Sequence, residues 1–153
     1  DHSANPVGHL VLYLFGHGDA DRQRLSDCTC TALQLANFWQ DIRRDREKGR
    51  VYLPREDMER FGVTEAHIAE GRVDDAFRRL MAHEIEQARA LFEEGLRLIP
   101  RVHPRLQKDL RLFSLGGMAI LDAIERNGYD VFTKRPTLST RQKAWLMVRQ
   151  ILG

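Results

Sequence analysis

Residues 19–48 read DADRQRLSDCTCTALQLANFWQDIRRDREK, with neither glycine nor proline between Gly18 and Gly49. Glycine and proline are the residues that most often end a helix, and an aspartate at position 19 or 21 can cap the first turn. The stretch therefore predicts a helix of about seven turns that runs to about Arg46.

The segments on either side of this helix also show helical spacing of their apolar residues. Asn5 followed by Pro6 predicts a capped and buried short helix near the start of the chain. Residues 128–136, GYDVFTKRP, are expected to be a linker, after which Ser139 or Thr140 caps a last helix. Further helices are expected over residues 54–62, from 64 to 71, from Asp74, and from about Pro104 to Asn127. No stretch alternates with period two, so we predict an all-α fold for residues 1–153, as a single domain fragment.

Composition is that of an ordinary globular domain and excludes several classes of function. The chain has 153 residues, of which 42% are hydrophobic and 30% charged. The longest apolar run, Leu10 to Phe15, is far too short to span a bilayer. A net charge of +2 without a long basic run argues against nucleic-acid binding. Cys28 and Cys30 diverge on a helix and cannot bridge each other, which favours a reducing, cytoplasmic location.

A polar stripe lies on one side of the long predicted helix. Gln34, Asn37, Asp41 and Asp45 fall within an arc of roughly 80° at 100° per residue. Asp41 and Asp45 are one turn apart, so their carboxylates can share hard cations such as Mg2+, which bridge the oxygens of a diphosphate. The amides of Asn37 and Gln34 can hydrogen-bond a phosphate or a metal-bound water without adding negative charge.

The same stripe is also compatible with a solvated helix face. Four basic residues could pair with the aspartates as ordinary surface partners, namely Arg43, Arg44, Arg46 and Lys48. Periodicity alone does not decide between the two interpretations.

Residues 34–45, QLANFWQDIRRD, followed by GRVYLP at 49–54, resemble the second aspartate-rich motif of the squalene and phytoene synthase family. SANPVG at 3–8 is similar to the segment that follows a Tyr-Cys pair in that family and lines its substrate channel. Asn5-Pro6, NFWQ at 37–40 and GYDV at 128–131 are most similar to the bacterial hydroxysqualene synthase branch, which serves squalene and hopanoid synthesis.

The resemblance extends along essentially the whole chain but covers only the C-terminal half of a family member. It implies the C-terminal part of an isoprenoid-synthase-type helical bundle, with the N-terminal portion and the first aspartate-rich motif expected upstream of Asp1. The sequence departs from several family members at Gly116-Gly117, where they carry an active-site tyrosine. No role is assigned to that position.

Family chemistry implies a role for each residue of the pattern. Ionising a prenyl diphosphate needs metal to take up the developing negative charge and an apolar cavity to shelter the carbocation. By resemblance Asp41 and Asp45 hold Mg2+, Asn37 and Gln34 support the diphosphate, and Arg50 with Tyr52 contacts the leaving group. The residues expected to line the cavity are Ala4, Val7, Gly8, Val11, Leu33 and Phe38.

The activity that the resemblance implies is a step of isoprenoid biosynthesis. Presqualene diphosphate would be ionised, its cation rearranged and quenched by water to hydroxysqualene, with Mg2+ and without a nicotinamide cofactor. Three alternatives stay open: head-to-head condensation of prenyl diphosphates such as farnesyl diphosphate, a catalytically silent member acting in assembly, and a free-standing binding bundle. The chain alone is expected to be inactive, with the missing N-terminal segment as its partner.

After Asp130 there are five basic residues and no acidic one, so the end of the chain could touch an anionic membrane or simply close the bundle.

Overall fold

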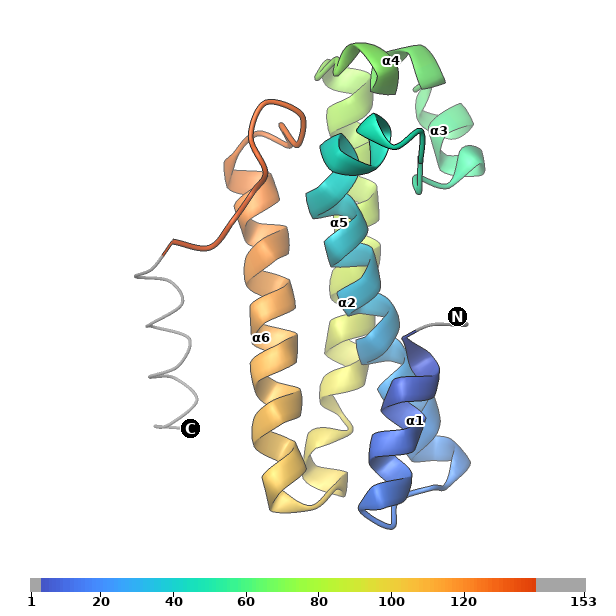
Figure 1. The fold of residues 1–153 in the computed structure, drawn as a ribbon, viewed down its shortest axis with the longest axis vertical. Helices are drawn as coiled ribbons and strands as arrows, with labels where there is room; N and C mark the ends of the chain where they lie inside the picture. The colour runs from blue at the N-terminus through green and yellow to red at the C-terminus, as the bar shows by residue number, and fades with distance from the viewer. Residues whose placement is uncertain (1–3, 140–153) are drawn as a thin grey trace.

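The computed structural model describes residues 4–139, and within them every regular element is helical (Figure 1). The predicted all-α fold class is therefore confirmed. The elements are α1 (Asn5–Leu14), α2 (Ala20–Glu47), α3 (Arg55–Phe61), α4 (Glu65–Glu70), α5 (Asp75–Leu96), the short 3-10 helix η1 (Ile99–Arg101) and α6 (Pro104–Arg126).

Helix α2 begins and ends close to the predicted residues. The Asp19 carboxylate accepts a hydrogen bond from the backbone N–H of Arg22 at 3.1 Å, which caps the first turn. The helix ends at Glu47, and Gly49 then takes a positive φ of 66° that turns the chain out of the helix. The long uninterrupted helix follows from the absence of helix-breaking residues, as the sequence predicted.

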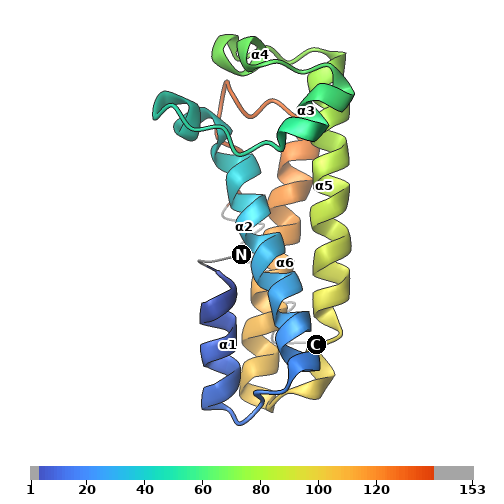
Figure 2. The same cartoon turned by 90° about the vertical axis from the view of Figure 1, so that its right-hand side faces the viewer.

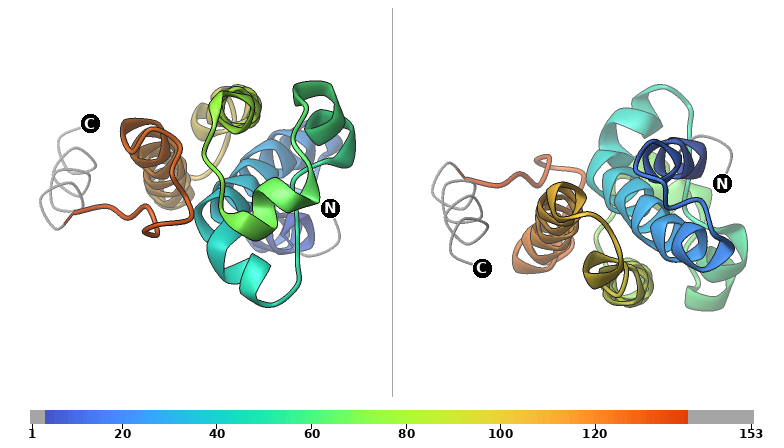
Figure 3. Two further views of the ribbon diagram at one scale, coloured as in Figure 1. Left: turned by 90° about the horizontal axis from the view of Figure 1, so that it is seen from above. Right: turned by 90° about the horizontal axis from the view of Figure 1, so that it is seen from below.

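Helices α2, α5 and α6 run alongside one another as the long axis of the molecule, with α3 and α4 across one end (Figures 1 and 2). The buried side chains between them include Trp39, Phe77, Met81, Ile85 and Phe92. Seen from the two ends in Figure 3, α1 lies beside α2.

Two glycines allow the long helices to approach closely. A Cβ added to Gly95 of α5 would lie 2.2 Å from Thr29 Oγ1 of α2, and one added to Gly117 of α6 would lie 2.2 Å from Phe92 Cζ. Both distances are shorter than any carbon contact tolerates, so glycine is required at these helix crossings.

Helix α1 differs from its prediction in two respects. Its N-cap is Ala4 without a side-chain hydrogen bond, and Asn5 is instead the first helical residue, whose Oδ1 accepts from Thr31 Oγ1 at 3.3 Å. The helix is not buried, because α2 covers one side and the described residues leave the other side open. Leu12 is buried, whereas Val7, Leu10, Tyr13 and Leu14 are 60% to 76% exposed.

The predicted linker is instead docked on α2. We call residues 128–137 the docked segment. Asp130 accepts hydrogen bonds from the backbone N–H groups of Phe132 and Thr133, which fixes a turn, and Val131 and Phe132 are buried. Phe132 packs against Phe77, with its ring centroid 5.0 Å away. Burial of these two apolar residues explains why the docked segment packs against the helices although many of its residues are polar.

The helix predicted after Ser139 or Thr140, with its membrane contact, lies outside the described residues. Among residues 4–139, no helix is long and apolar enough to cross a bilayer.

Candidate functional site

The polar stripe lies on the half of α2 that precedes α3. Asp41 and Asp45 are partly buried, Gln34 is partly buried, and Asn37 is exposed. Since α2 is an unbroken helix, Asp41 and Asp45 are one turn apart on the same side, as the sequence predicted.

Asp41 forms a forked ion pair with Arg135 of the docked segment. Arg135 Nε donates to Asp41 Oδ1 at 2.6 Å, and Nη2 donates to Oδ2 at 3.1 Å. The same Nη2 donates to Gln40 Oε1 at 2.8 Å, and Arg44 Nη1 lies 3.7 Å from Asp41 Oδ1. The hydrogen bond from Arg135 is the main cause of a lowered pKa of the Asp41 carboxyl. Asp41 is therefore held as a carboxylate.

The basic loop after α2 is anchored by its backbone and by one ring. The backbone N–H of Arg50 donates to the carbonyl oxygen of Asp45 at 2.8 Å, and the Arg50 side chain is exposed. Tyr52 stacks on Phe38 of α2, with ring centroids 4.1 Å apart. This contact places Tyr52 against Phe38, which lies three residues before Asp41 on α2.

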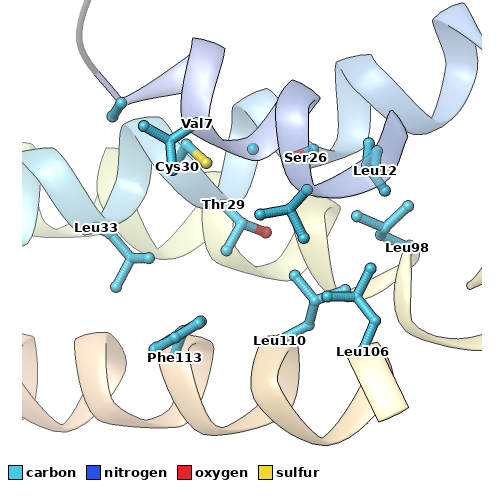
Figure 4. Close-up of a pocket in the computed structure, with 13 residues that line it drawn as sticks. Val7, Leu12, Ser26, Thr29, Cys30, Leu33, Leu98, Leu106, Leu110 and Phe113 are labelled. Carbon is cyan, nitrogen blue, oxygen red and sulfur yellow. The ribbon is translucent and has the colours of Figure 1, made fainter. Parts of the chain in front are cut away.

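An apolar pocket of about 230 Å³ lies between α1, α2 and α6 (Figure 4). Five of the six residues expected to line a cavity are found together there: Ala4, Val7, Gly8, Val11 and Leu33. Phe38, the sixth, is not among its lining residues, because its ring stacks on Tyr52. From α6, Leu106, Leu110 and Phe113 face these residues across the pocket.

Polar atoms at the pocket are few. Ser26, Thr29 and Cys30 of α2 contribute the hydroxyls and the thiol that line it. Burial raises the pKa of the Cys30 thiol, so this group stays protonated at neutral pH. The pocket is suited to a hydrocarbon chain and offers no ionised group to it.

The donor atoms of the stripe fit part of a divalent-metal site. Carboxylate and amide oxygens are the ligands that Mg2+ prefers, and Asp41 and Asp45 present carboxylates one turn apart. Within residues 4–139, no group of three or more His, Cys, Asp or Glu side chains is placed to hold a metal ion. The two aspartates could therefore supply a share of the ligands of such an ion.

Sequence reasoning missed two residues that the structure brings to the stripe. Arg135 lies 94 positions after Asp41, in a stretch expected to be a linker. Gln40 is buried, and it binds both Arg135 and the carbonyl oxygen of Pro136. No local pattern identifies such contacts, because Arg135 and its partners on α2 are more than 90 residues apart in sequence.

The all-α bundle that carries the paired carboxylates and the apolar pocket has an isoprenoid-synthase-type helical fold, as solved squalene and dehydrosqualene synthases show. A family model described as squalene/phytoene synthase matches residues 1–142, and the chain belongs to this family.

Individual relatives agree with the family assignment. The phytoene synthase of Arthrospira platensis is 39% identical over 115 residues, which are 73% of this chain and 36% of that protein. The crystal structure of squalene synthase HpnC from Alicyclobacillus acidocaldarius has a TM-score of 0.83 and 55% identity, covering 84% of this chain and 49% of that one. A dehydrosqualene synthase in complex with ligand has a TM-score of 0.87 and 26% identity, covering 97% of this chain and 53% of that one. The chain spans about a third to a half of the length of these relatives.

Proposed function

We propose that this chain is part of the catalytic bundle of a Mg2+-dependent synthase that acts on prenyl diphosphates. The observation that carries the proposal is the pair Asp41 and Asp45, one turn apart on α2, with an apolar pocket further along the same helix. A charged diphosphate and a hydrocarbon chain need these two environments side by side.

The residues of the chain divide between the two ends of such a substrate. Asp41 and Asp45 would hold Mg2+, which when bound takes up negative charge on the diphosphate leaving group. Asn37 and Gln34 would hydrogen-bond the diphosphate or the water around it. Arg50 and Tyr52 would contact the leaving group from the loop that Tyr52 fixes on Phe38. Val7, Val11 and Leu33 would contact the hydrocarbon chain and exclude water from it.

The specific reaction we propose is conversion of presqualene diphosphate to hydroxysqualene. The carbon–oxygen bond to diphosphate breaks, the cation rearranges, and a water oxygen bonds to carbon while it releases a proton to solvent or base. The 55% identity to squalene synthase HpnC, against 39% to a phytoene synthase and 26% to a dehydrosqualene synthase, supports the squalene-synthase side of the family, to which this reaction belongs in our proposal. Head-to-head condensation of two prenyl diphosphates, of the squalene or phytoene synthase type, is the second candidate, because the curated relatives include phytoene synthases.

We also propose that activity needs a further helical segment. Among residues 4–139, the two aspartates provide only a share of a metal's ligands, and the side of α1 that carries Leu10 and Leu14 is not covered. The first aspartate-rich motif of the family would supply the remaining ligands, so the chain alone would be inactive. If the protein were instead a catalytically silent member that acts in assembly, its function would not depend on the metal site.

Product analysis by mass spectrometry tests this proposal on a protein that combines the chain with the other half of the family bundle. Presqualene diphosphate and Mg2+ are supplied with and without NADPH. We expect hydroxysqualene without NADPH, loss of product in Asp41→Asn, and retained product in Glu47→Gln, an exposed carboxylate on the same helix. Squalene formed only with NADPH would select a squalene-synthase-type reaction, in which hydride from NADPH replaces water at the rearranged cation. Equal turnover by Asp41→Asn and the unmodified protein would overturn the metal role.

A further inference from the structure

Arg135 uses its donors on one carboxylate and one amide. Nε and Nη2 bind the two oxygens of Asp41, and Nη2 also binds Gln40 Oε1. The Asp41 side chain is 26% exposed and that of Arg135 is 35% exposed. The contact is therefore partly withdrawn from solvent, where forked guanidinium–carboxylate pairs are stronger than surface ion pairs.

The position of Arg135 is fixed by its neighbours in the docked segment. Gln40 Nε2 donates to the carbonyl oxygen of Pro136, and Arg43 Nη1 donates to that of Thr133 at 2.9 Å. Phe132, three residues before Arg135, packs against Phe77 of α5. These contacts do not involve Asp41, so the docked segment can stay on α2 if the ion pair opens.

We propose that Arg135 is a resident counter-ion for Asp41, which a divalent metal must displace in order to bind. The proposal rests on the proposed function, since it takes Asp41 as a metal ligand. Both oxygens of Asp41 already accept hydrogen bonds from the guanidinium, and a dication brought to them is repelled by the positive charge beside them. Metal alone therefore binds weakly.

A metal ion bound to a diphosphate carries a net negative charge, so the guanidinium of Arg135 does not repel it as it repels the free dication. The displaced guanidinium stays close to the site because of the Pro136, Thr133 and Phe132 contacts, and the anion gives it a new partner. Asp41 then binds the metal in place of Arg135, and Arg135 binds phosphate oxygens in place of Asp41. Binding of metal and anion becomes cooperative, and by linkage each raises the affinity for the other by the same factor.

Arg44 provides a matched control on the same carboxylate. Its Nη1 lies 3.7 Å from Asp41 Oδ1, and its side chain is 64% exposed, so it adds a positive charge nearby without a hydrogen bond of normal length. Arg44→Gln and Arg135→Gln remove the same charge, but only the second frees the oxygens of Asp41. Arg135→Lys keeps the charge and removes the fork.

The experiment is titration of Mn2+, a probe for Mg2+, into the unmodified chain and these variants, each combined with the other half of the family bundle as in the product analysis. Binding is followed by electron paramagnetic resonance, and helix content is checked by circular dichroism. We expect Arg135→Gln to bind free Mn2+ roughly tenfold more tightly than the unmodified chain, Arg44→Gln to change affinity by less than about twofold, and Arg135→Lys to lie between. The preformed Mn2+–pyrophosphate complex should bind the unmodified chain more tightly than free Mn2+ does. Arg135→Gln should lose that advantage.

Three results would overturn the inference. Equal or weaker Mn2+ binding by Arg135→Gln and Arg135→Lys would exclude displacement, while the metal role of Asp41 would stand. An equal gain in Mn2+ affinity in Arg44→Gln would show that Arg135 acts only through its positive charge and not through its hydrogen bonds to Asp41. Failure of the unmodified chain and all variants to bind Mn2+, with or without pyrophosphate, would overturn both this inference and the proposed metal site.

Discussion

The rings of Phe38 and Tyr52 are stacked, with centroids 4.1 Å apart and planes within 6° of parallel. Phe38 belongs to α2 and Tyr52 to the loop that follows it, so the contact ties the basic loop to the helix that carries the aspartates. The loop is thereby held beside the stripe although Val51 and Tyr52 themselves are largely exposed.

Replacing Tyr52 with leucine should loosen this loop. The stacked pair is worth roughly 0.5–1.5 kcal/mol, and leucine keeps apolar area while it removes the stacking. We expect faster hydrogen exchange at the amides of Arg50 to Leu53 and little change in the core of α5. Unchanged exchange at these amides would show that the backbone bond from Arg50 to Asp45 alone fixes the loop.

The adjacent glycines of α6 should respond to alanine in opposite directions. A Cβ at position 117 would lie 2.2 Å from Phe92 Cζ and 3.1 Å from Leu33 Cδ2, so Gly117→Ala should lower the free energy of unfolding by roughly 1–3 kcal/mol. A Cβ at position 116 meets no atom within 4 Å. Gly116→Ala should therefore stabilise the helix by about 0.5–1 kcal/mol. Urea unfolding of both variants measures the difference, and similar shifts would contradict the packing argument.

Stability should fall between weakly acidic and neutral pH because of Glu84. This buried residue of α5 has a pKa raised to about 7, mainly by desolvation and next by Asp57 of α3, and its Oε1 has no hydrogen-bond partner. The folded state keeps a proton that the unfolded state releases above its ordinary pKa of 4.5, so the stabilising contribution is complete below pH 4.5 and is lost as pH rises through 7.

The pH effect can be measured by urea unfolding between pH 5 and 8. The upper limit of the change is about 3 kcal/mol, and Glu84→Gln, which cannot ionise, should flatten most of it. Glu86→Gln, an exposed neighbour on the same helix, should leave the slope as it is. A profile that Glu84→Gln does not alter would assign the pH dependence to other groups.

Gly8 should control how closely α1 covers the apolar pocket. A Cβ at this position would lie 2.4 Å from Ser26 Oγ and 2.8 Å from Cys30 Sγ, so Gly8→Ala requires these side chains to rotate or α1 to move away from α2. We expect a loss of roughly 1–3 kcal/mol in stability and altered binding of an apolar fluorescent probe. Adding Ser26→Ala removes the nearer atom and should recover part of the loss. Strict additivity of the two changes would show that the atoms do not meet.

Local signals predicted most of the helices. The Asp19 and Asp74 caps, the Gly62 and Gly71 ends and the uninterrupted α2 all depend on residues within one turn of the feature they set. The one-turn spacing of Asp41 and Asp45 followed directly from α2 being a helix.

Contacts distant in sequence could not be predicted in this way. The ring of Phe38 turns toward Tyr52 because that loop folds back on α2, and a helix pattern does not contain this information. The exposure of α1 depends on what packs against its second side, so apolar spacing alone led to the wrong expectation of burial. The docking of Arg135 depends on the turn at Asp130 and on burial of Phe132.

The docked segment also sets an order of events during synthesis. Arg135 is added to the chain 94 residues after Asp41, and ribosomes add about 5–20 residues per second. Asp41 is therefore synthesised roughly 5–20 seconds before Arg135. Over that interval α2, α5 and α6 can pack as each is completed, whereas the acidic end of α2 has no cation from the docked segment. Among residues 4–139, the aspartate stripe is thus one of the last parts to reach its final surroundings during synthesis.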